Sequence, residues 1–316
     1  MNNDTLSPLF LQSVVGPFTI IGKSGSTIPL EIYNPNKTAM LVDQIRFSLR
    51  QADPEAIDQE YYVALAIEVL LGSIPLTNKS VTLGALAPRY LGAGAAVMNS
   101  DGPAGDGNLV WHLPKPLYVP PLVQLTLHVK RQKSSPEDSG GATVPAINIS
   151  VVGRSLPADF PVPSEIDVPW VTETQCNVAN PDTIGATDSP NRFVSADSDL
   201  VNSNNEPLHI TQFVGVNYRV SPDARTHTSG PTPADLTVQM SLSNGTMLVR
   251  DAIPFFVAFP SDRGILPVSA KLQPGAFVRL ELESTVPPGG EEWDGCSFTA
   301  VAMHGYRRVQ TPGTWG

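Results

Sequence analysis

Charged side chains are scarce in this 316-residue chain. They make up 16% of the residues, whereas globular domains average about 25%. Only two cysteines occur, Cys176 and Cys296, and neither lies in the Cys-x-x-Cys or Cys/His spacing of a metal site. Their positions leave open whether they form a disulfide, and unpaired buried thiols are the simpler interpretation.

Long apolar runs and basic segments are also missing. No stretch reaches the roughly 18 consecutive apolar residues that span a bilayer, so we expect no membrane span. The N-terminal residues carry no basic region before an apolar run, and we expect no signal peptide. With 20 Lys and Arg against 30 Asp and Glu, the net charge is −10. Nucleic-acid binding requires a basic surface that displaces counterions, so we expect no direct contact with nucleic acid.

Proline and alternating apolar residues are abundant. The 31 prolines are about twice the usual share of ~5%, which disfavours long helices because proline removes an amide donor. Apolar and polar residues alternate with a period of two in several segments, which predicts strands with one face in a core. The clearest are "IRFSLR" (45–50), "VQLTLHVK" (123–130), "INISVV" (147–152), "LTVQMSLSNG" (236–245) and "VRLELES" (278–284).

The chain repeats itself at a distance of about half its length. "YNPNKTAMLVDQI" (33–45) and "VNSNNEPLHITQF" (201–213) share asparagines and strand residues at a constant numbering offset of 168 (202 − 34). Three further blocks follow in the same order, at offsets of 173, 155 and 152: 62–86 with 235–259, 117–127 with 272–282, and 146–155 with 298–307. Because the order is collinear, we interpret the chain as a duplicated β-domain.

One segment, Glu55 to Leu71, favours a helix on local propensity. The duplication overrides this preference in part, since "YVALAIEVLLG" (62–72) aligns with the alternating segment "DLTVQMSLSNG" (235–245). We therefore predict a strand from about Tyr62, preceded by one helical turn.

Each half contains about eight short strands separated by Gly, Pro and Asn turns, which is typical of a sandwich or barrel. Each half is also longer than the ~100 residues of an immunoglobulin domain, the runner-up. We predict an all-β fold of two tandem, internally duplicated, eight-stranded antiparallel jelly-roll domains. The predicted parts are an N-terminal arm (1–17), a first domain (18–156), a proline-rich connector (157–192), a second domain (193–309) and a C-terminal tail (310–316).

No motif indicates catalysis or a cofactor. "GKS" at 22–24 lacks the first glycine of a phosphate-binding loop. Glu291 and Glu292 are adjacent in a Gly/Pro-rich loop rather than opposed across a cleft. The histidines have no metal-site spacing; they are His112, His128, His209, His227 and His304. We expect no cofactor, no metal and no enzymatic activity.

Apolar side chains lie near both ends of the chain. Leu9, Phe10 and Leu11 follow the N-terminus, and Trp315 precedes the last residue. Chain ends usually fray, so apolar residues there require a surface to cover them. They either fold back on their own domain or contact a neighbouring subunit, and we take these four residues as candidate subunit contacts.

The duplicated jelly-roll pattern resembles the double jelly-roll coat proteins of tailless phages and related viruses, of which three copies form a pseudo-sixfold capsomer. The resemblance covers most of the chain and rests on architecture and duplication. It implies a virion structural protein of a bacteriophage, either a capsid coat or a cement (decoration) subunit, made in the host cytoplasm. Its implied partners are further copies of itself, in a homotrimer, and other capsid proteins. Independently, the uncharged second faces of strands, such as Thr237, Gln239 and Ser241, suit subunit interfaces.

Two other classes remain open from the sequence. A carbohydrate-binding module would use exposed aromatic side chains, and Trp111, Trp170, Trp293 and Tyr90 are candidates. A metal-dependent or hydrolytic jelly-roll enzyme would need a ligand or acid–base cluster that the spacing does not reveal.

Overall fold

The computed structural model describes residues 8–14, 27–34, 37–50, 65–87, 107–131, 146–178, 192–193, 199–220, 236–260, 264–284 and 296–312. In the first half these residues form two antiparallel sheets and one short helix, α2 (Leu83–Leu86). One sheet has the strand order β1 (Pro8–Val14), β9 (Ala146–Ser155), β3 (Met40–Arg50), β7 (Gly107–Val119). The other has the order β2 (Thr27–Tyr33), β8 (Gln124–Arg131), β4 (Leu65–Leu71), β5 (Ile74–Pro75), and β6 (Val81–Thr82) also pairs with β4.

The second half repeats this arrangement strand for strand, with helix α3 (Phe255–Ala258) in the place of α2. One sheet has the order β10 (Glu165–Val178), β18 (Cys296–Gln310), β13 (Leu208–Val220), β16 (Ile265–Leu272). The other has the order β11 (Arg192–Phe193), β17 (Phe277–Ser284), β14 (Leu236–Leu242), β15 (Met247–Pro254), and β12 (Asp199–Val201) also pairs with β17. We call β1 to β9 with α2 the first repeat, and β10 to β18 with α3 the second repeat.

These strand orders confirm the predicted pair of antiparallel jelly rolls. Within each repeat the chain crosses between two sheets, and the strand pairs β5/β6 and β11/β12 each occupy one position, which gives eight positions per repeat. The prediction of a strand rather than a helix is also confirmed from Leu65 onward by β4. The helical turn predicted before Tyr62 lies outside the described residues.

A bulge and a glycine recur at equivalent places in the two repeats. The register of β3 shifts between Val42 and Gln44, and that of β13 shifts between Ile210 and Gln212, at the predicted offset of 168. Gly153 lies opposite Val42, and Gly305 lies opposite Ile210, at the predicted offset of 152. A Cβ atom on either glycine would collide with the backbone carbonyl of the strand beside it. Both positions therefore require glycine.

The other two predicted offsets, 155 and 173, are too large by two for the strand pairs β8/β17 and β4/β14. In the first repeat the Gly72 amide donates to the Gln124 carbonyl, and in the second repeat the Ser243 amide donates to the Phe277 carbonyl. These equivalent bonds give offsets of 153 (277 − 124) and 171 (243 − 72). Side chains alternate with a period of two, so a shift of two residues keeps every side chain on its face. The apolar pattern could not distinguish the two alignments.

The predicted arm and the predicted connector each contain a strand of a sheet. β1 pairs with β9, and β10 pairs with β18 along its whole length. β10 contributes to the core, because Val168, Trp170 and Val171 are buried. We propose that each repeat begins with its own edge strand, so that the repeats span 8–155 and 165–310.

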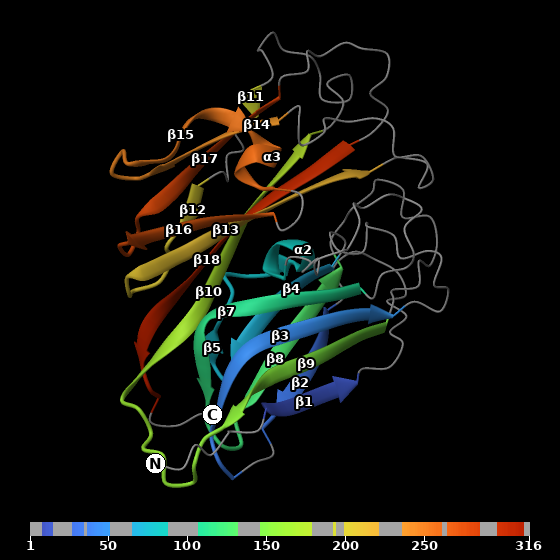
Figure 1. Ribbon diagram of the computed structural model, residues 1–316, viewed down its shortest axis with the longest axis vertical. Helices are drawn as coiled ribbons and strands as arrows, with labels where there is room; N and C mark the ends of the chain where they lie inside the picture. The colour runs from blue at the N-terminus through green and yellow to red at the C-terminus, as the bar shows by residue number, and fades with distance from the viewer. Residues whose placement is uncertain are drawn as a thin grey trace.

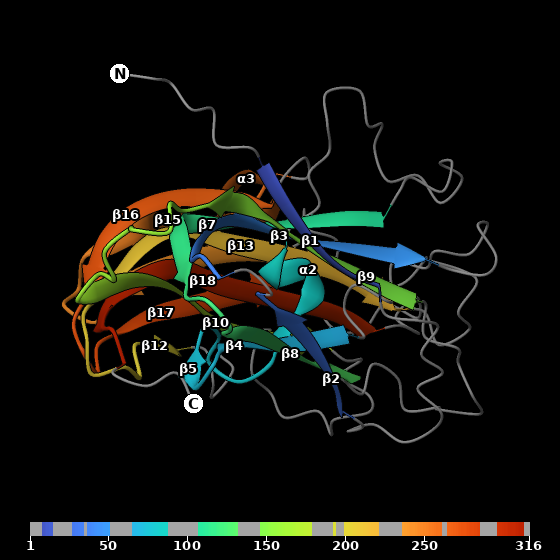
Figure 2. The same ribbon diagram turned by 90° about the horizontal axis from the view of Figure 1, so that it is seen from below.

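The two repeats are stacked along the long axis of the molecule (Figure 1). β10 and β18 pass from the lower repeat into the upper one, and the view from below shows the strands as curved layers around α2 (Figure 2). The buried apolar residues form two clusters, one per repeat, but the first cluster also includes side chains of the second repeat: Ile166, Val168, Val171, Ala300, Ala302 and Val309. The repeats therefore share part of one core.

Candidate subunit interface

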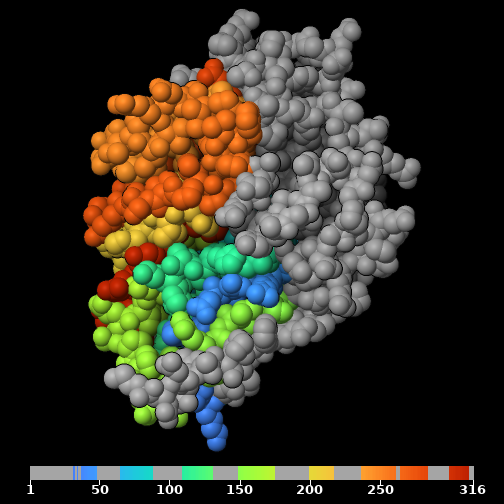
Figure 3. All heavy atoms as spheres, viewed as in Figure 1, coloured from blue at the N-terminus to red at the C-terminus, as the bar shows by residue number. Residues whose placement is uncertain are grey.

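The junction between the two repeats is a buried interface between jelly rolls within one chain. α2 of the first repeat lies against β13 and β18 of the second. All four residues of α2 are buried. On the second repeat, Val214, Ala300 and Ala302 are fully buried beneath it. In the space-filling view, atoms of the first repeat lie directly beneath those of the second (Figure 3).

His304 of β18 fastens α2 to the second repeat. Its Nε2 lies 2.8 Å from the Ala85 carbonyl oxygen, so Nε2 carries the proton and donates the hydrogen bond. The side chain is fully buried. Burial lowers the pKa of His304 from 6.5 to about 4, and the hydrogen bond to Ala85 offsets only part of that shift. The imidazole is therefore neutral near pH 7.

The loop between β5 and β6 attaches to β10 through backbone and side-chain bonds. The backbone amide of Asn78 donates to the Val171 carbonyl (2.7 Å), and the backbone amide of Val171 donates to the Leu76 carbonyl (3.1 Å). The Thr82 backbone amide and hydroxyl both donate to the carboxylate of Glu173, the hydroxyl at 2.6 Å. Hydrogen bonds to an ionised group are stronger than neutral ones, so this contact fixes β6 against β10.

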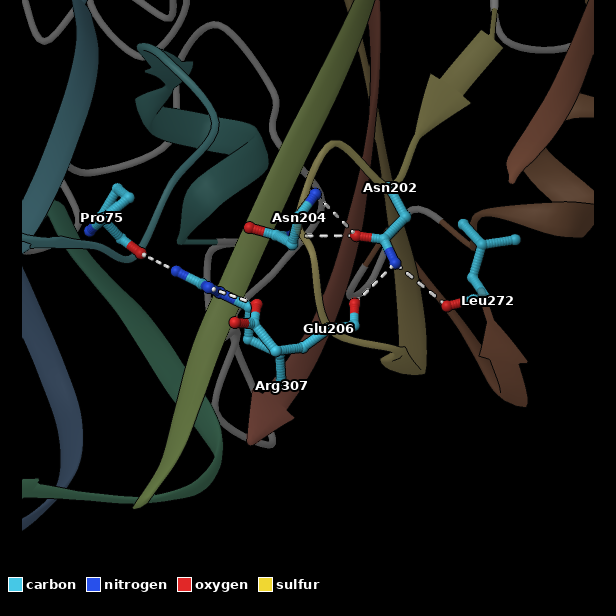
Figure 4. Close-up of polar contacts among 6 residues, drawn as sticks. All are labelled: Pro75, Asn202, Asn204, Glu206, Leu272 and Arg307. Carbon is cyan, nitrogen blue, oxygen red and sulfur yellow. Dashed lines mark hydrogen bonds and ion pairs between the residues drawn. The ribbon is translucent and has the colours of Figure 1, made fainter. Parts of the chain in front are cut away.

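Arg307 connects three parts of the junction (Figure 4). Its Nη1 donates to the Glu206 carboxylate (2.9 Å), and its Nη2 donates to the Pro75 carbonyl (3.3 Å) of the first repeat. The guanidinium carbon lies 5.0 Å from the centre of the Trp170 ring. The side chain of Arg307 is only 9% exposed, whereas that of its neighbour Arg308, paired with Asp167, is 64% exposed. Arg307 therefore belongs to the core of the junction.

The duplicated asparagine turn makes the same pair of side-chain hydrogen bonds in each repeat. Nδ2 of Asn202 donates to the carbonyls of Glu206 and Leu272, both at 3.0 Å (Figure 4). Nδ2 of Asn34 donates likewise to the carbonyls of Thr38 and Pro120, at 3.2 and 3.1 Å. Each asparagine is buried and connects its turn to the end of a strand, β7 or β16, from which the chain crosses to the other sheet of the repeat. The asparagines that match in the sequence therefore make equivalent hydrogen bonds in the two repeats.

α3 of the second repeat is the counterpart of α2, but none of the described residues covers its outer face. Phe255 and Ala258 are buried, while Phe256 is 46% exposed and Val257 is 52% exposed. Two adjacent exposed apolar side chains on a helix are a feature of binding surfaces. The sequence reasoning missed α3, because a four-residue helix has no periodic signal.

The four predicted contact residues are only partly located. Leu9, Phe10 and Leu11 lie in β1, opposite Gly153, Val152 and Val151 of β9, so their backbone is paired within the first repeat. Trp315 lies outside the described residues. Their role in subunit contacts stays a prediction.

Two of the aromatic candidates for carbohydrate binding are buried. Trp111 is 1% exposed and Trp170 is 4% exposed, so neither offers a ring to a sugar. Trp293 and Tyr90 lie outside the described residues.

Among the described residues, no group of three or more His, Cys, Asp and Glu side chains is placed to hold a metal ion. The adjacent acids Glu291 and Glu292 lie outside those residues. Within the same part of the chain, no helix is long and apolar enough to cross a membrane.

The two cysteines lie on neighbouring strands but out of register. Cys176 of β10 is opposite Thr299 of β18, three residues from Cys296. At about 3.4 Å per residue this is a displacement of roughly 10 Å along the strand, whereas disulfide Cα atoms lie within about 7 Å. Cys176 and Cys296 of one chain therefore do not pair in this fold.

Comparison with known proteins adds distant structural similarities. No family model and no curated protein matches the chain. The mavirus major capsid protein is 9% identical over 100% of this chain and 92% of its own, with a TM-score of 0.42. The Faustovirus major capsid protein is 8% identical over 99% and 92%, also with a TM-score of 0.42. PBCV-1 VP54, fitted into a reconstruction of the virophage Sputnik, is 11% identical over 96% and 95%, with the same TM-score.

Proposed function

We propose that this chain is a virion structural protein, a capsid coat subunit that acts by assembling with copies of itself. The observation that supports this role is the fusion of two equivalent jelly rolls through a buried junction within one chain. Such a junction fixes the angle between the two units. A chain with two similar units held at a fixed angle is suited to a closed ring of similar units.

The proposed assembly is a homotrimer that presents six jelly rolls around its axis. Most soluble homo-oligomers have closed cyclic symmetry, and a head-to-tail contact closes into a ring when its rotation permits. A low content of charged side chains, 16% of the chain, suits faces that pack against neighbours. A cement role on a preformed shell, a bacteriophage origin and contacts with other capsid proteins stay predictions from the sequence.

The test is the mass of the purified chain by light scattering over a concentration series. A trimer of three 33.7 kDa chains, about 101 kDa, is expected at micromolar concentration. Electron microscopy of the same sample should show rings with pseudo-sixfold outlines. A monodisperse monomer at every concentration, which forms neither rings nor shells, would contradict the coat role.

A further inference from the structure

The short helices α2 and α3 are the same structural element in two settings. The residues before them, Thr82 and Pro254, have φ/ψ of −53°/133° and −54°/137°. The residues after them, Ala87 and Phe259, have φ/ψ of −128°/82° and −124°/81°. In each helix the amide of the residue after the helix donates to the carbonyl of its first residue, at 2.9 and 2.7 Å. The two helices therefore share one backbone conformation, including both ends.

Their surroundings differ. The central residues of α2, Gly84 and Ala85, are buried beneath the second repeat. The corresponding residues of α3 are Phe256 and Val257, and both are exposed. α3 therefore presents a larger apolar surface than α2 at the place where α2 forms the junction, and that surface is exposed in the single chain.

The sheet that receives α2 also has a counterpart. On the second repeat, the outer face of β13 and β18 carries Val214, Ala302 and His304, all fully buried by the first repeat. The strand registers place Arg46, Ser150 and Val152 at the equivalent positions of β3 and β9 in the first repeat. Arg46 is exposed, and Ser150 and Val152 are partly exposed, so this outer face is accessible. One chain thus contains an exposed helix and an exposed sheet face. They are the counterparts of the helix and the sheet face that form the junction within the chain.

We propose that α3 of one copy docks on the outer face of β3 and β9 of a second copy, as α2 docks on β13 and β18 within the chain. This inference rests on the proposed coat function and identifies the surface that closes the trimer. The contact is head-to-tail, because the second repeat of one copy meets the first repeat of the next. Intrachain and interchain junctions then alternate around the ring.

Side-chain sizes on the two surfaces are reciprocal at the centre of this contact. In the junction a small residue of the helix, Ala85, faces a large one of the sheet, His304. On the two exposed surfaces the sizes are reversed. Val257 of the helix is larger than its counterpart Ala85, and Val152 of the sheet is smaller than its counterpart His304. Phe256 adds an aromatic face, and Arg46 on the sheet is a cation that stacks favourably on such a face.

The test compares two double substitutions that each replace one Phe and one Val by Asp. F256D/V257D changes α3. The control F160D/V162D changes Phe160 and Val162, which are 42% and 67% exposed in the segment between the repeats. We expect F256D/V257D to remain folded by circular dichroism and to raise the trimer dissociation constant roughly 30-fold or more, the effect of losing an interface hot spot. The control variant F160D/V162D should leave the trimer dissociation constant unchanged.

A second pair of variants tests the partner surface. Phe256→Lys and Arg46→Glu should each weaken the trimer, and the combination F256K/R46E should regain part of the affinity, because opposite charges then meet across the interface. If the wild-type chain is a trimer and F256D/V257D is an equally stable trimer, the docking surface is wrong while the coat function stands. If the wild-type chain never assembles, the coat function fails and this interface fails with it.

Discussion

The two repeats place a large and a small side chain at the same two core positions, but in the opposite order. In the first repeat, Phe47 on β3 and Ala87, which follows α2, are both buried in one core cluster. In the second repeat the equivalent positions, at offsets of 168 and 172, are Gly215 and Phe259. A Cβ atom on Gly215 would lie 2.6 and 2.7 Å from the Cδ atoms of the Phe259 ring. The strand supplies the ring in one repeat, and the segment after the helix supplies it in the other.

This exchange shows that the duplication conserves volume rather than residue identity. Protein cores tolerate substitution when the total volume is kept, and they lose stability when it is not. The two repeats can therefore differ at most positions while their strand orders remain equal. Identity persists where no exchange is possible, as at Gly153 and Gly305, where a backbone carbonyl occupies the space.

The exchange predicts a strong coupling between Gly215 and Phe259. Gly215→Phe alone places two rings in one space, and we expect the protein not to fold. Phe259→Ala alone leaves a cavity and should lower the free energy of unfolding by about 4 kcal/mol. The double variant G215F/F259A restores the arrangement of the first repeat and should be more stable than either single variant.

Urea unfolding of the three proteins measures this coupling. Gly215→Ala, alone and with Phe259→Ala, provides a milder cycle if Gly215→Phe yields no soluble protein. Additive effects in both cycles would show that the two positions are independent, and the comparison of the repeats would lose its physical basis.

The equivalent asparagine turns predict that replacing either asparagine lowers the free energy of unfolding by the same amount. Asn34→Ala and Asn202→Ala each remove an amide that donates to two carbonyls, so each should lower the free energy of unfolding by about 2 to 3 kcal/mol. The exposed Asn244 serves as control, and Asn244→Ala should cost less than about 1 kcal/mol. A large effect in only one repeat, measured by denaturant unfolding, would mean that the matched turns are not equivalent in energy.

His304 has no titratable counterpart, because Val152 takes its place in the first repeat. Its pKa is about 4 in the folded chain, against 6.5 for an ordinary histidine such as that of the unfolded chain. The neutral imidazole is therefore stabilising above pH 6.5, and this stability is lost as the pH falls from 6.5 towards 4. Between pH 7 and pH 5 we expect a loss of about 2 kcal/mol from this group.

His304→Gln isolates that contribution. A glutamine amide can still donate to the Ala85 carbonyl, but it does not titrate. The free energy of unfolding of the wild type should fall between pH 7 and pH 5 by about 2 kcal/mol more than that of the variant. Parallel pH profiles would show that the junction is not sensitive to the protonation of His304.

The fold class and the duplication could both be predicted from the order of the residues alone. Period-two alternation places apolar residues on one face of each strand, and this pattern is local, so it can be read without coordinates. The asparagine turn and the bulge were found at the correct offset of 168 because polar and apolar positions both match there. The strand from Leu65 was predicted correctly despite the local helix propensity, because the matching segment of the second repeat alternates unambiguously.

The way in which the two repeats pack against each other could not be predicted from local patterns. The alignment of β8 with β17 differs from the sequence-based one by two residues, a shift that the alternation cannot detect. The strand character of β10, the burial of α2 beneath His304, and the exposure of Phe256 and Val257 all depend on contacts between residues far apart in the chain. Local patterns encode which face of an element is apolar, whereas long-range packing decides which of those faces remain exposed for a partner.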